Sequence, residues 1–222
     1  INTMEQWWNK EKKDPVTGMM PDINPDNAVF VLQGRGGTGK TTIVDKAINK
    51  LGIPTGNVRF ALPTHKAKQV IMGAAGSYTE SQFDTIAALL GLKPGNVHDE
   101  TTNQWERKFI RDKDSYDEKM KELAGVELIV VDESSMVNEA QTQALLNIAQ
   151  EMNIRLLFMG DNVQLPPIEV DAETRTGTLD IARVFDTVMG ILQKAPVPMA
   201  ENEDGRKIHY SILSERMRQD KG

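Results

Sequence analysis

Residues 34–41 constrain the fold more than any other part of the sequence. Their letters, G-R-G-G-T-G-K-T, match the pattern G-x-x-x-x-G-K-[S/T], in which backbone N–H groups cradle phosphate oxygens. The apolar run 28–32 before them is typical of a buried strand, and residues 42–48 after them are typical of a helix. A strand, a glycine-rich loop and a helix in this order place a phosphate site at the helix N-terminus.

The loop residues predict ATP and Mg²⁺ as cofactors. Lys40 would reach the outer phosphates, and the Thr41 hydroxyl would hold the metal ion. The glycines are needed because a side chain would clash with a ligand so close to the backbone. The residues expected to bind nucleotide here are Gly36, Gly37, Thr38, Gly39, Lys40, Thr41 and Thr42.

Two later strand ends carry polar groups suited to the same chemistry. Asp132 and Glu133 follow the most hydrophobic run of the chain, 127–131, and they are adjacent carboxylates that could hold Mg²⁺ and activate water. The alternative is a solvated strand end before a turn. Gln164 lies in G-D-N-V-Q-L-P-P after the apolar run 154–159, where an amide could sense the γ-phosphate. Ordinary turn chemistry is the alternative there.

Strands that alternate with helices predict an α/β fold in which helices cover both faces of a parallel sheet. Ligands of such sheets bind at the carboxyl ends of the strands, where every motif described here falls. Further strands are expected at 58–62 and 208–213, and helices at 3–13, 65–72, 81–90, 139–152 and 179–193.

The segment 93–123 differs from its surroundings. It is strongly charged with mixed sign, and its few large apolar groups include Trp105 and Phe109. We therefore expect three parts: a first part of the main domain over 1–92, an inserted sub-domain over 93–123, and the rest of the main domain over 124–222. The two aromatic residues could form a wedge that separates strands of nucleic acid, or a small satellite core.

Composition excludes several classes of protein. The net charge of −6 argues against a broadly basic protein that coats nucleic acid, although Arg59, His65, Lys66 and Lys68 cluster without an acidic neighbour. No run approaches the ~20 apolar residues of a membrane span, and no signal peptide is visible. The absence of cysteine excludes disulfides and fits a reducing cytoplasm, or a host cytoplasm for a viral protein. The start at Ile1 leads us to expect a fragment of a longer chain.

Four motifs in order carry a resemblance. G-R-G-G-T-G-K-T, L-P-T-H-K-A-K, V-V-D-E-S-S-M and G-D-N-V-Q-L-P-P together resemble the first RecA-like motor domain of superfamily 1 DNA helicases, most closely the RecD and Dda branch. The resemblance implies a RecA-like phosphate-loop domain that couples Mg-ATP hydrolysis to movement on single-stranded DNA. It also implies a five-prime to three-prime direction.

The resemblance assigns roles to individual residues. It makes Asp132 a Mg²⁺ ligand, Glu133 the catalytic base, and Gln164 a link between nucleotide and DNA. It makes Gln6 an adenine reader, although Thr3 and Gln6 also have capping-box spacing. It gives Arg218, or alternatively Arg216, contact with the γ-phosphate. The residues that it implies bind the DNA backbone are Pro63, Thr64, His65, Lys66 and Lys68.

Two departures from the family pattern matter. Ala87 stands where the family often has histidine, which puts a DNA or coupling role for that position in doubt. The motifs of a second RecA-like domain are also missing. ATP in these motors is hydrolysed between two such domains, so we expect this chain alone to be weakly active or inactive. Its expected partners are single-stranded DNA, a second RecA-like domain of the same parent, and replication or repair proteins.

Other functions remain open at this point. A small-molecule kinase shares the phosphate loop but needs an acceptor pocket, and paired carboxylates followed by a glutamine suit activation of water better. A nucleotide-gated DNA-binding module without turnover is a second alternative, which the intact Lys40, Thr41, Asp132 and Glu133 disfavour. Within the helicase reading, the parent could also be the helicase subunit of an exonuclease complex.

Overall fold

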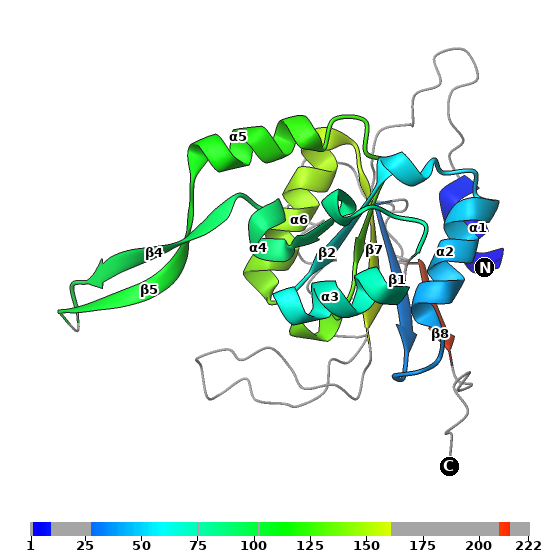
Figure 1. Ribbon diagram of the computed structural model, residues 1–222, viewed down its shortest axis with the longest axis horizontal. Helices are drawn as coiled ribbons and strands as arrows, with labels where there is room; N and C mark the ends of the chain where they lie inside the picture. Colours follow the sequence, from blue (N-terminus) through cyan, green and yellow to red (C-terminus); the bar gives the residue numbers. More distant parts are fainter. Residues whose placement is uncertain (1, 10–27, 75, 102, 161–208, 214–222) are drawn as a thin grey trace, which may run out of the picture.

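The computed structural model describes residues 2–9, 28–74, 76–101, 103–160 and 209–213 of the 222-residue chain (Figure 1). Six strands form one sheet in the order β3-β2-β6-β7-β1-β8, and each neighbouring pair is parallel. The expected fold class is therefore confirmed. The strands are β1 Val29–Gly34, β2 Val58–Leu62, β3 Phe83–Thr85, β6 Leu128–Val131, β7 Arg155–Gly160 and β8 His209–Leu213.

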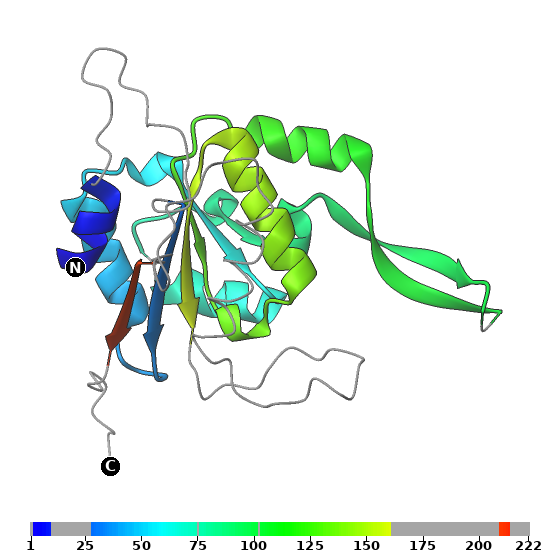
Figure 2. The same ribbon diagram turned by 180° about the vertical axis from the view of Figure 1, so that it is seen from behind.

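Helices cover both faces of this sheet, with α2 and α3 on one side and α6 on the other (Figures 1 and 2). The longer helices are α1 Asn2–Asn9, α2 Lys40–Lys50, α3 His65–Ala74, α5 Lys113–Glu122 and α6 Glu139–Met152. The short ones are α4 Ile86–Leu89 and the 3-10 turns η1 Thr55–Asn57, η2 Glu80–Gln82 and η3 Ser134–Met136. No helix in the described ranges is long and apolar enough to cross a membrane.

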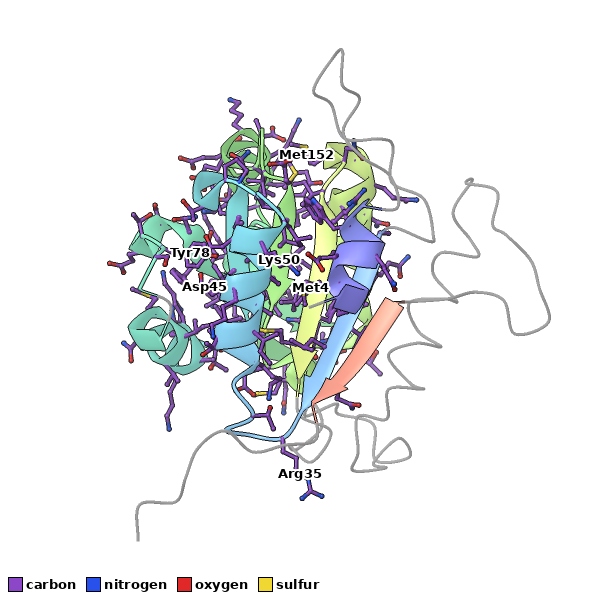
Figure 3. All side chains as sticks on the ribbon, turned by 90° about the vertical axis from the view of Figure 1, so that its right-hand side faces the viewer. Met4, Arg35, Asp45, Lys50, Tyr78 and Met152 are labelled. Carbon is purple, nitrogen blue, oxygen red and sulfur yellow. The ribbon has the colours of Figure 1, made fainter. Side chains whose placement is uncertain are left out.

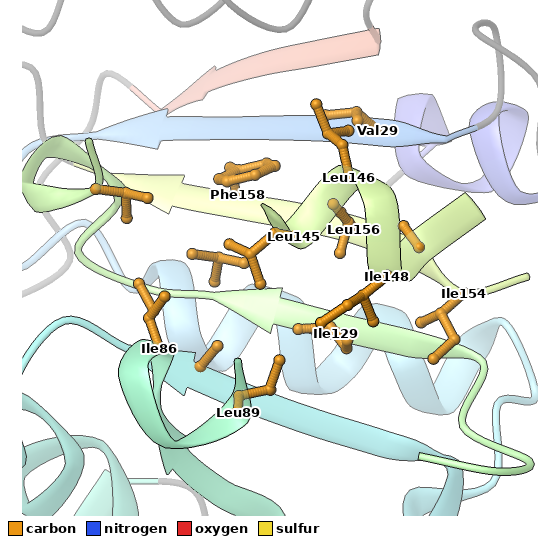
Figure 4. Close-up of a cluster of buried hydrophobic side chains, with 14 of the residues drawn as sticks. Val29, Ile86, Leu89, Ile129, Leu145, Leu146, Ile148, Ile154, Leu156 and Phe158 are labelled. Atoms are coloured by element: carbon orange, nitrogen blue, oxygen red, sulfur yellow. The ribbon is translucent and has the colours of Figure 1, made fainter. Parts of the chain in front are cut away.

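The alternation of side chains along each strand creates two cores. Val29 and Val31 of β1 join the cluster beneath α6, which Figure 4 shows in close-up. Phe30 and Leu32 of the same strand join the cluster beneath α1, α2 and α3. Because successive residues of a strand point to opposite faces, one continuous apolar run supplies both layers.

Helix α1 docks through its aromatic residues. Trp7 is fully buried and packs on Phe30, with ring centroids 5.3 Å apart. The buried Arg155 donates a hydrogen bond to the Trp8 carbonyl over 2.8 Å and lies 4.7 Å from the Trp8 ring. Helix α1 begins at Asn2, so Thr3 lies within its first turn. An N-cap residue must stand before the first turn, so the capping-box interpretation of Thr3 and Gln6 was wrong.

Strands β4 (Leu92–Asp99) and β5 (Gln104–Arg111) form a separate antiparallel sheet, which we call the arm. The arm projects away from the main sheet (Figure 1). Its base is closed by a hydrogen bond from the Asp112 N–H to the Gly91 carbonyl over 3.1 Å. Lys93 lies 2.8 Å from the Asp112 carboxylate, and this contact, with help from Ser115, lowers the pKa of Asp112 to about 2.

The helix expected over 81–90 was wrong. Residues 83–85 form strand β3 at the edge of the sheet, residues 81–82 belong to the 3-10 turn η2, and only 86–89 are α-helical. Phe83 is buried beside Phe60 of β2, with ring centroids 4.7 Å apart. Apolar residues at 83, 86 and 89 fit a helix by spacing, but pairing with β2 buries Phe83 more completely. Thr85 then accepts a hydrogen bond from the Ala88 N–H and caps α4.

Candidate nucleotide site

The phosphate loop folds tightly between β1 and α2. Gly37 and Gly39 have φ angles of 80° and 77°, in the left-handed region that favours glycine. Thr38 is buried, and both its N–H and its hydroxyl donate to the Arg35 carbonyl, over 3.2 and 2.8 Å. This turn gives the loop a defined shape.

The first turn of α2 faces the loop with unused donors. Gly39 occupies the N-cap position without a side chain that could accept from the helix N–H groups. The bond from the Ile43 N–H to the Gly39 carbonyl begins the helix, so the preceding N–H groups have no partner within the helix. These donors, with the positive end of the helix dipole, fit the phosphates of a nucleotide.

Lys40 is held at the loop itself. Its ammonium group donates to the Gly34 carbonyl over 2.6 Å and to the Arg35 carbonyl over 3.2 Å. Thr41 is half-buried beside it, and Thr42 and Gly36 are exposed. Both cation and hydroxyl are thus positioned at the helix start, where the sequence predicts phosphate and Mg²⁺ binding.

Asp132 shares the electrostatic environment of this loop. Its N–H donates to the Ala61 carbonyl over 3.1 Å, so the residue continues β6 past its carboxyl end. Burial raises the pKa of Asp132 from its ordinary 3.8 to about 6, and the charge of Glu133 adds to this rise. The Glu133 N–H, 2.8 Å from Asp132 Oδ1, and the Lys40 cation oppose it. A bound divalent cation would favour the ionised form, so the carboxylate fits a metal ligand.

Glu133 has an unusual backbone. Its φ angle is 53°, in the left-handed region where residues other than glycine are uncommon. It forms the N-cap of η3, and its carbonyl accepts from the Met136 N–H over 2.9 Å. Its side chain is half-buried. This conformation turns the chain sharply after Asp132, so the two carboxylates need not point the same way. The sequence carried no signal for it.

The segment 63–68 joins β2 to α3 at the same edge of the sheet. Thr64 Oγ1 accepts from the Ala67 N–H over 3.1 Å and caps α3, which leaves the hydroxyl proton free to donate. Thr64, His65 and Lys66 are exposed, whereas Pro63 and Lys68 are half-buried. The start of this helix therefore offers exposed donors and positive charge at the edge of the sheet that also carries the phosphate loop.

Arg59 does not lie with these basic residues, although it is close to them in the sequence. It lies near the opposite end of β2, and its guanidinium donates to the Gly56 and Val58 carbonyls over 2.7 and 2.9 Å. Residues 60–62 of the extended strand separate Arg59 from segment 63–68, although the two are close in the sequence.

Gln6 stands apart from the phosphate loop. It is exposed on α1, and the adjacent Glu5 forms a 2.9 Å ion pair with Lys50, at the end of α2 remote from the loop. Its role as an adenine reader stays a prediction. Gln164, Arg216 and Arg218 lie outside the described residues.

A family model and several known proteins resemble this chain. A model described as an AAA domain matches residues 20–180. An uncharacterized protein, R530 of Acanthamoeba polyphaga mimivirus, is 30% identical over 178 residues, covering 72% of this chain and 34% of that protein. The chain thus spans about a third of the length of this curated relative.

Among solved structures, the Pif1 helicase from Candida albicans is 16% identical, with a TM-score of 0.50 over 97% of this chain and 40% of that one. A Bacteroides Pif1 bound to single-stranded DNA is 22% identical, with a TM-score of 0.47 over 86% of this chain and 39% of that one. The first likeness shows the fold. The family model spans the loop, the paired carboxylates and the basic segment. The chain therefore belongs to the AAA domain family, and it shares its fold with the Candida albicans protein.

Proposed function

We propose that this chain is the ATP-hydrolysing motor domain of a DNA helicase that moves on single-stranded DNA in the five-prime to three-prime direction. The observation that carries the proposal is the meeting of Lys40 and Asp132 at one sheet edge, close enough for the Lys40 cation to affect the pKa of Asp132. The exposed basic segment 63–68 follows a strand at the same edge. The Candida albicans protein that shares the fold is a helicase.

In the proposed mechanism, Lys40 and the N–H groups of the loop bind and orient the phosphates of ATP. Thr41 and Asp132 hold Mg²⁺, which neutralises charge on the phosphate oxygens when bound. Glu133, whose backbone adopts a left-handed conformation, would orient a water molecule and accept its proton. Gln164 and Arg218 are proposed to sense and stabilise the γ-phosphate, and Gln6 to read adenine, on resemblance alone.

DNA would cross the edge at Pro63, Thr64, His65, Lys66 and Lys68. Donors at a helix N-terminus can bind backbone phosphates, and such contacts carry no sequence information. This suits a motor that must step along any strand.

The arm supports a role in strand separation rather than a satellite core. Trp105 is 72% exposed and Phe109 63% exposed, so neither fills a core. They share one face of the arm with His98, whose ring lies 5.2 Å from that of Trp105. Exposed rings of this kind can stack on bases. We propose that this face contacts nucleic acid at the point where strands part.

The proposal also covers domains and partners. The parts 1–92 and 124–222 would together form the first RecA-like domain, with 93–123 inserted between them. A second RecA-like domain of the parent would complete the cleft, and replication or repair proteins would assist in the cytoplasm. A helicase subunit of an exonuclease complex is the second candidate, because it would contain the same motor.

The test is steady-state ATP hydrolysis by the full-length protein with and without single-stranded DNA, beside its Glu133→Gln variant. We expect strong stimulation by DNA, which the variant loses while it still binds nucleotide. Hydrolysis that is indifferent to DNA would contradict the helicase proposal. Loss of ATP that requires a small-molecule acceptor would indicate a kinase instead.

A further inference from the structure

An exposed methionine at the carboxyl edge of the main sheet has no place in the mechanism above. Met136 lies in η3, three residues after Glu133, and it is 41% exposed. The other exposed large apolar side chains of the described residues lie on the arm or, in the case of Val70, further along α3. Met136 differs from them because it follows directly on the paired carboxylates.

The short turn that carries Met136 is anchored on both sides of it. Ser134 and Val137 are buried, and Val137 belongs to the core beneath α6. The Met136 N–H donates to the Glu133 carbonyl over 2.9 Å, and the Val137 N–H donates to the Ser134 carbonyl over 3.2 Å. The turn also contacts β7. Its neighbours therefore hold Met136 at a defined place on the surface.

Strands β2 and β6 end side by side at this edge. Ala61 is paired with Val131, and the Asp132 N–H donates to the Ala61 carbonyl over 3.1 Å. Beyond this point the two chains part, because the segment 63–68 leads into α3 on one face of the sheet and η3 leads toward α6 on the other. The phosphate donors at the start of α3 and the side chain of Met136 thus lie on opposite sides of one edge.

The exposed charges of the edge fit a polyanion. Lys66 is exposed in the first turn of α3, and Arg35 is exposed where β1 ends and projects away from the sheet (Figure 3). A single strand of nucleic acid has phosphates on one side and aromatic bases on the other. A strand that places its phosphates at the start of α3 would therefore turn its bases toward η3.

We propose that Met136 is an apolar contact for a base of the single strand whose phosphates the segment 63–68 binds. The thioether of methionine is polarizable and contacts aromatic rings favourably. It can contact any base, because every base presents an aromatic face, so a motor that steps along any sequence can use it. This inference rests on the proposed function, and it adds a base contact to the backbone contacts of the segment 63–68.

The test measures how tightly the full-length protein binds two single-stranded oligonucleotides of equal length, by fluorescence anisotropy. One is oligothymidine, and the other is abasic, with the same phosphates but no bases. Met136→Ala should bind oligothymidine about two- to tenfold more weakly than the wild type, the range expected for a contact between sulfur and an aromatic ring. It should bind the abasic oligonucleotide like the wild type. Lys66→Ala should weaken both by the same factor, because it removes a phosphate contact.

Val70→Ala is the matched control. Val70 is 69% exposed, more than Met136, but it lies further along α3, away from the edge. The variant should bind both oligonucleotides like the wild type. Met136→Leu keeps the volume and the apolar character of the side chain, so it should retain most of the affinity for oligothymidine. If Met136→Ala melts at a lower temperature than the wild type, Met136→Gln replaces it, because glutamine keeps the length of the side chain and removes its apolar end.

The inference is overturned if Met136→Ala binds oligothymidine as tightly as the wild type, or loses affinity equally for both oligonucleotides. A loss of the same size in Val70→Ala would also overturn it, because the effect would then not depend on the edge. If the wild type binds neither oligonucleotide, the proposed function fails as well. If the wild type binds both and its ATP hydrolysis is stimulated by DNA while Met136→Ala binds like it, only this inference fails.

Discussion

The carboxyl edge of the main sheet and the arm both present groups that a ligand could meet, but they hold those groups in different ways. At the edge, the geometry is in the backbone: Gly37, Gly39 and Glu133 adopt left-handed conformations, and Asp132 is partly buried. On the arm, the candidate groups are exposed rings on a two-stranded ribbon. We therefore expect substitutions at the edge to affect ATP hydrolysis, and substitutions of the exposed rings to affect only the binding of nucleic acid.

The strongest test of the edge is Lys40→Ala. Removal of one preorganised cation from a phosphoryl-transfer site should lower the rate of ATP hydrolysis by about 10²–10³. Lys46→Ala, an exposed lysine further along α2, is the matched control and should hydrolyse ATP at the wild-type rate. A steady-state assay measures the rates of ATP hydrolysis. Equal rates for the wild type, Lys40→Ala and Lys46→Ala would show that Lys40 does not act in hydrolysis.

The base of the arm should be sensitive to Gly91→Ala. Gly91 has a φ of 65°, and a Cβ there would lie 2.6 Å from the Tyr116 Cα. Left-handed strain and the backbone clash together should lower the free energy of unfolding by about 2–4 kcal/mol. Gly125→Ala has a φ of 80° but open space around it, so it should cost only the strain, about 1–2 kcal/mol. Urea denaturation measures both, and equal costs would show that Gly91 is not clamped.

Asp132→Asn should stabilise the metal-free protein. The folded pKa of about 6 exceeds the ordinary 3.8, so the folded state binds the proton more tightly, and this group costs stability as pH rises from about 4 to 6. Because the residue keeps some exposure, we expect a gain of about 1–2 kcal/mol at pH 7 in the variant. Unfolding in chelator should show the difference between variant and wild type vanish near pH 4. A variant that is less stable at pH 7 would contradict the assignment of burial as the cause.

Trp105→Ala should have the smallest effect and the most selective one. Because the ring is exposed, stability should change by less than about 0.5 kcal/mol. Loss of base stacking should weaken binding of forked or single-stranded DNA by about tenfold. Ile110→Ala is the control on the opposite face, where the isoleucine lies over Gly95. Fluorescence anisotropy should show that Ile110→Ala binds DNA as tightly as the wild type. An equal loss of DNA affinity in both variants would show that the two faces of the arm do not differ in DNA binding.

The backbone of the edge could largely be predicted from the sequence because the loop pattern needs glycine where the backbone is left-handed. Glycines at 37 and 39 and a helix start at Lys40 follow from the loop pattern, and the carboxylates at 132–133 follow from the apolar run before them. The left-handed Glu133 could not be predicted, since nothing in a glutamate at that position signals a positive φ.

The elements around the arm were harder to predict for a different reason. Residues 81–90 have spacing that fits a helix, and only pairing with β2 decides that Phe83 joins the sheet. The arm itself has no core to impose a hydrophobic period, so its charged sequence resembled an irregular insertion. Trp105 and Phe109 are four positions apart with three charged residues between them, a spacing that fits one face of a helix as well as one face of a strand.

The closed base of the arm has a mechanical consequence. Eight residues per strand make the ribbon about 27 Å long, so it acts as a lever whose fulcrum lies at Gly91 and Asp112. Lys119 of α5 forms a 3.0 Å ion pair with Asp84 of β3, which binds the fulcrum to the edge strand of the main sheet. A rotation of about 10° there would displace the tip by about 5 Å, more than the ~3.4 Å rise of one nucleotide in a duplex strand. A small rotation at the base would therefore become a larger displacement at the tip.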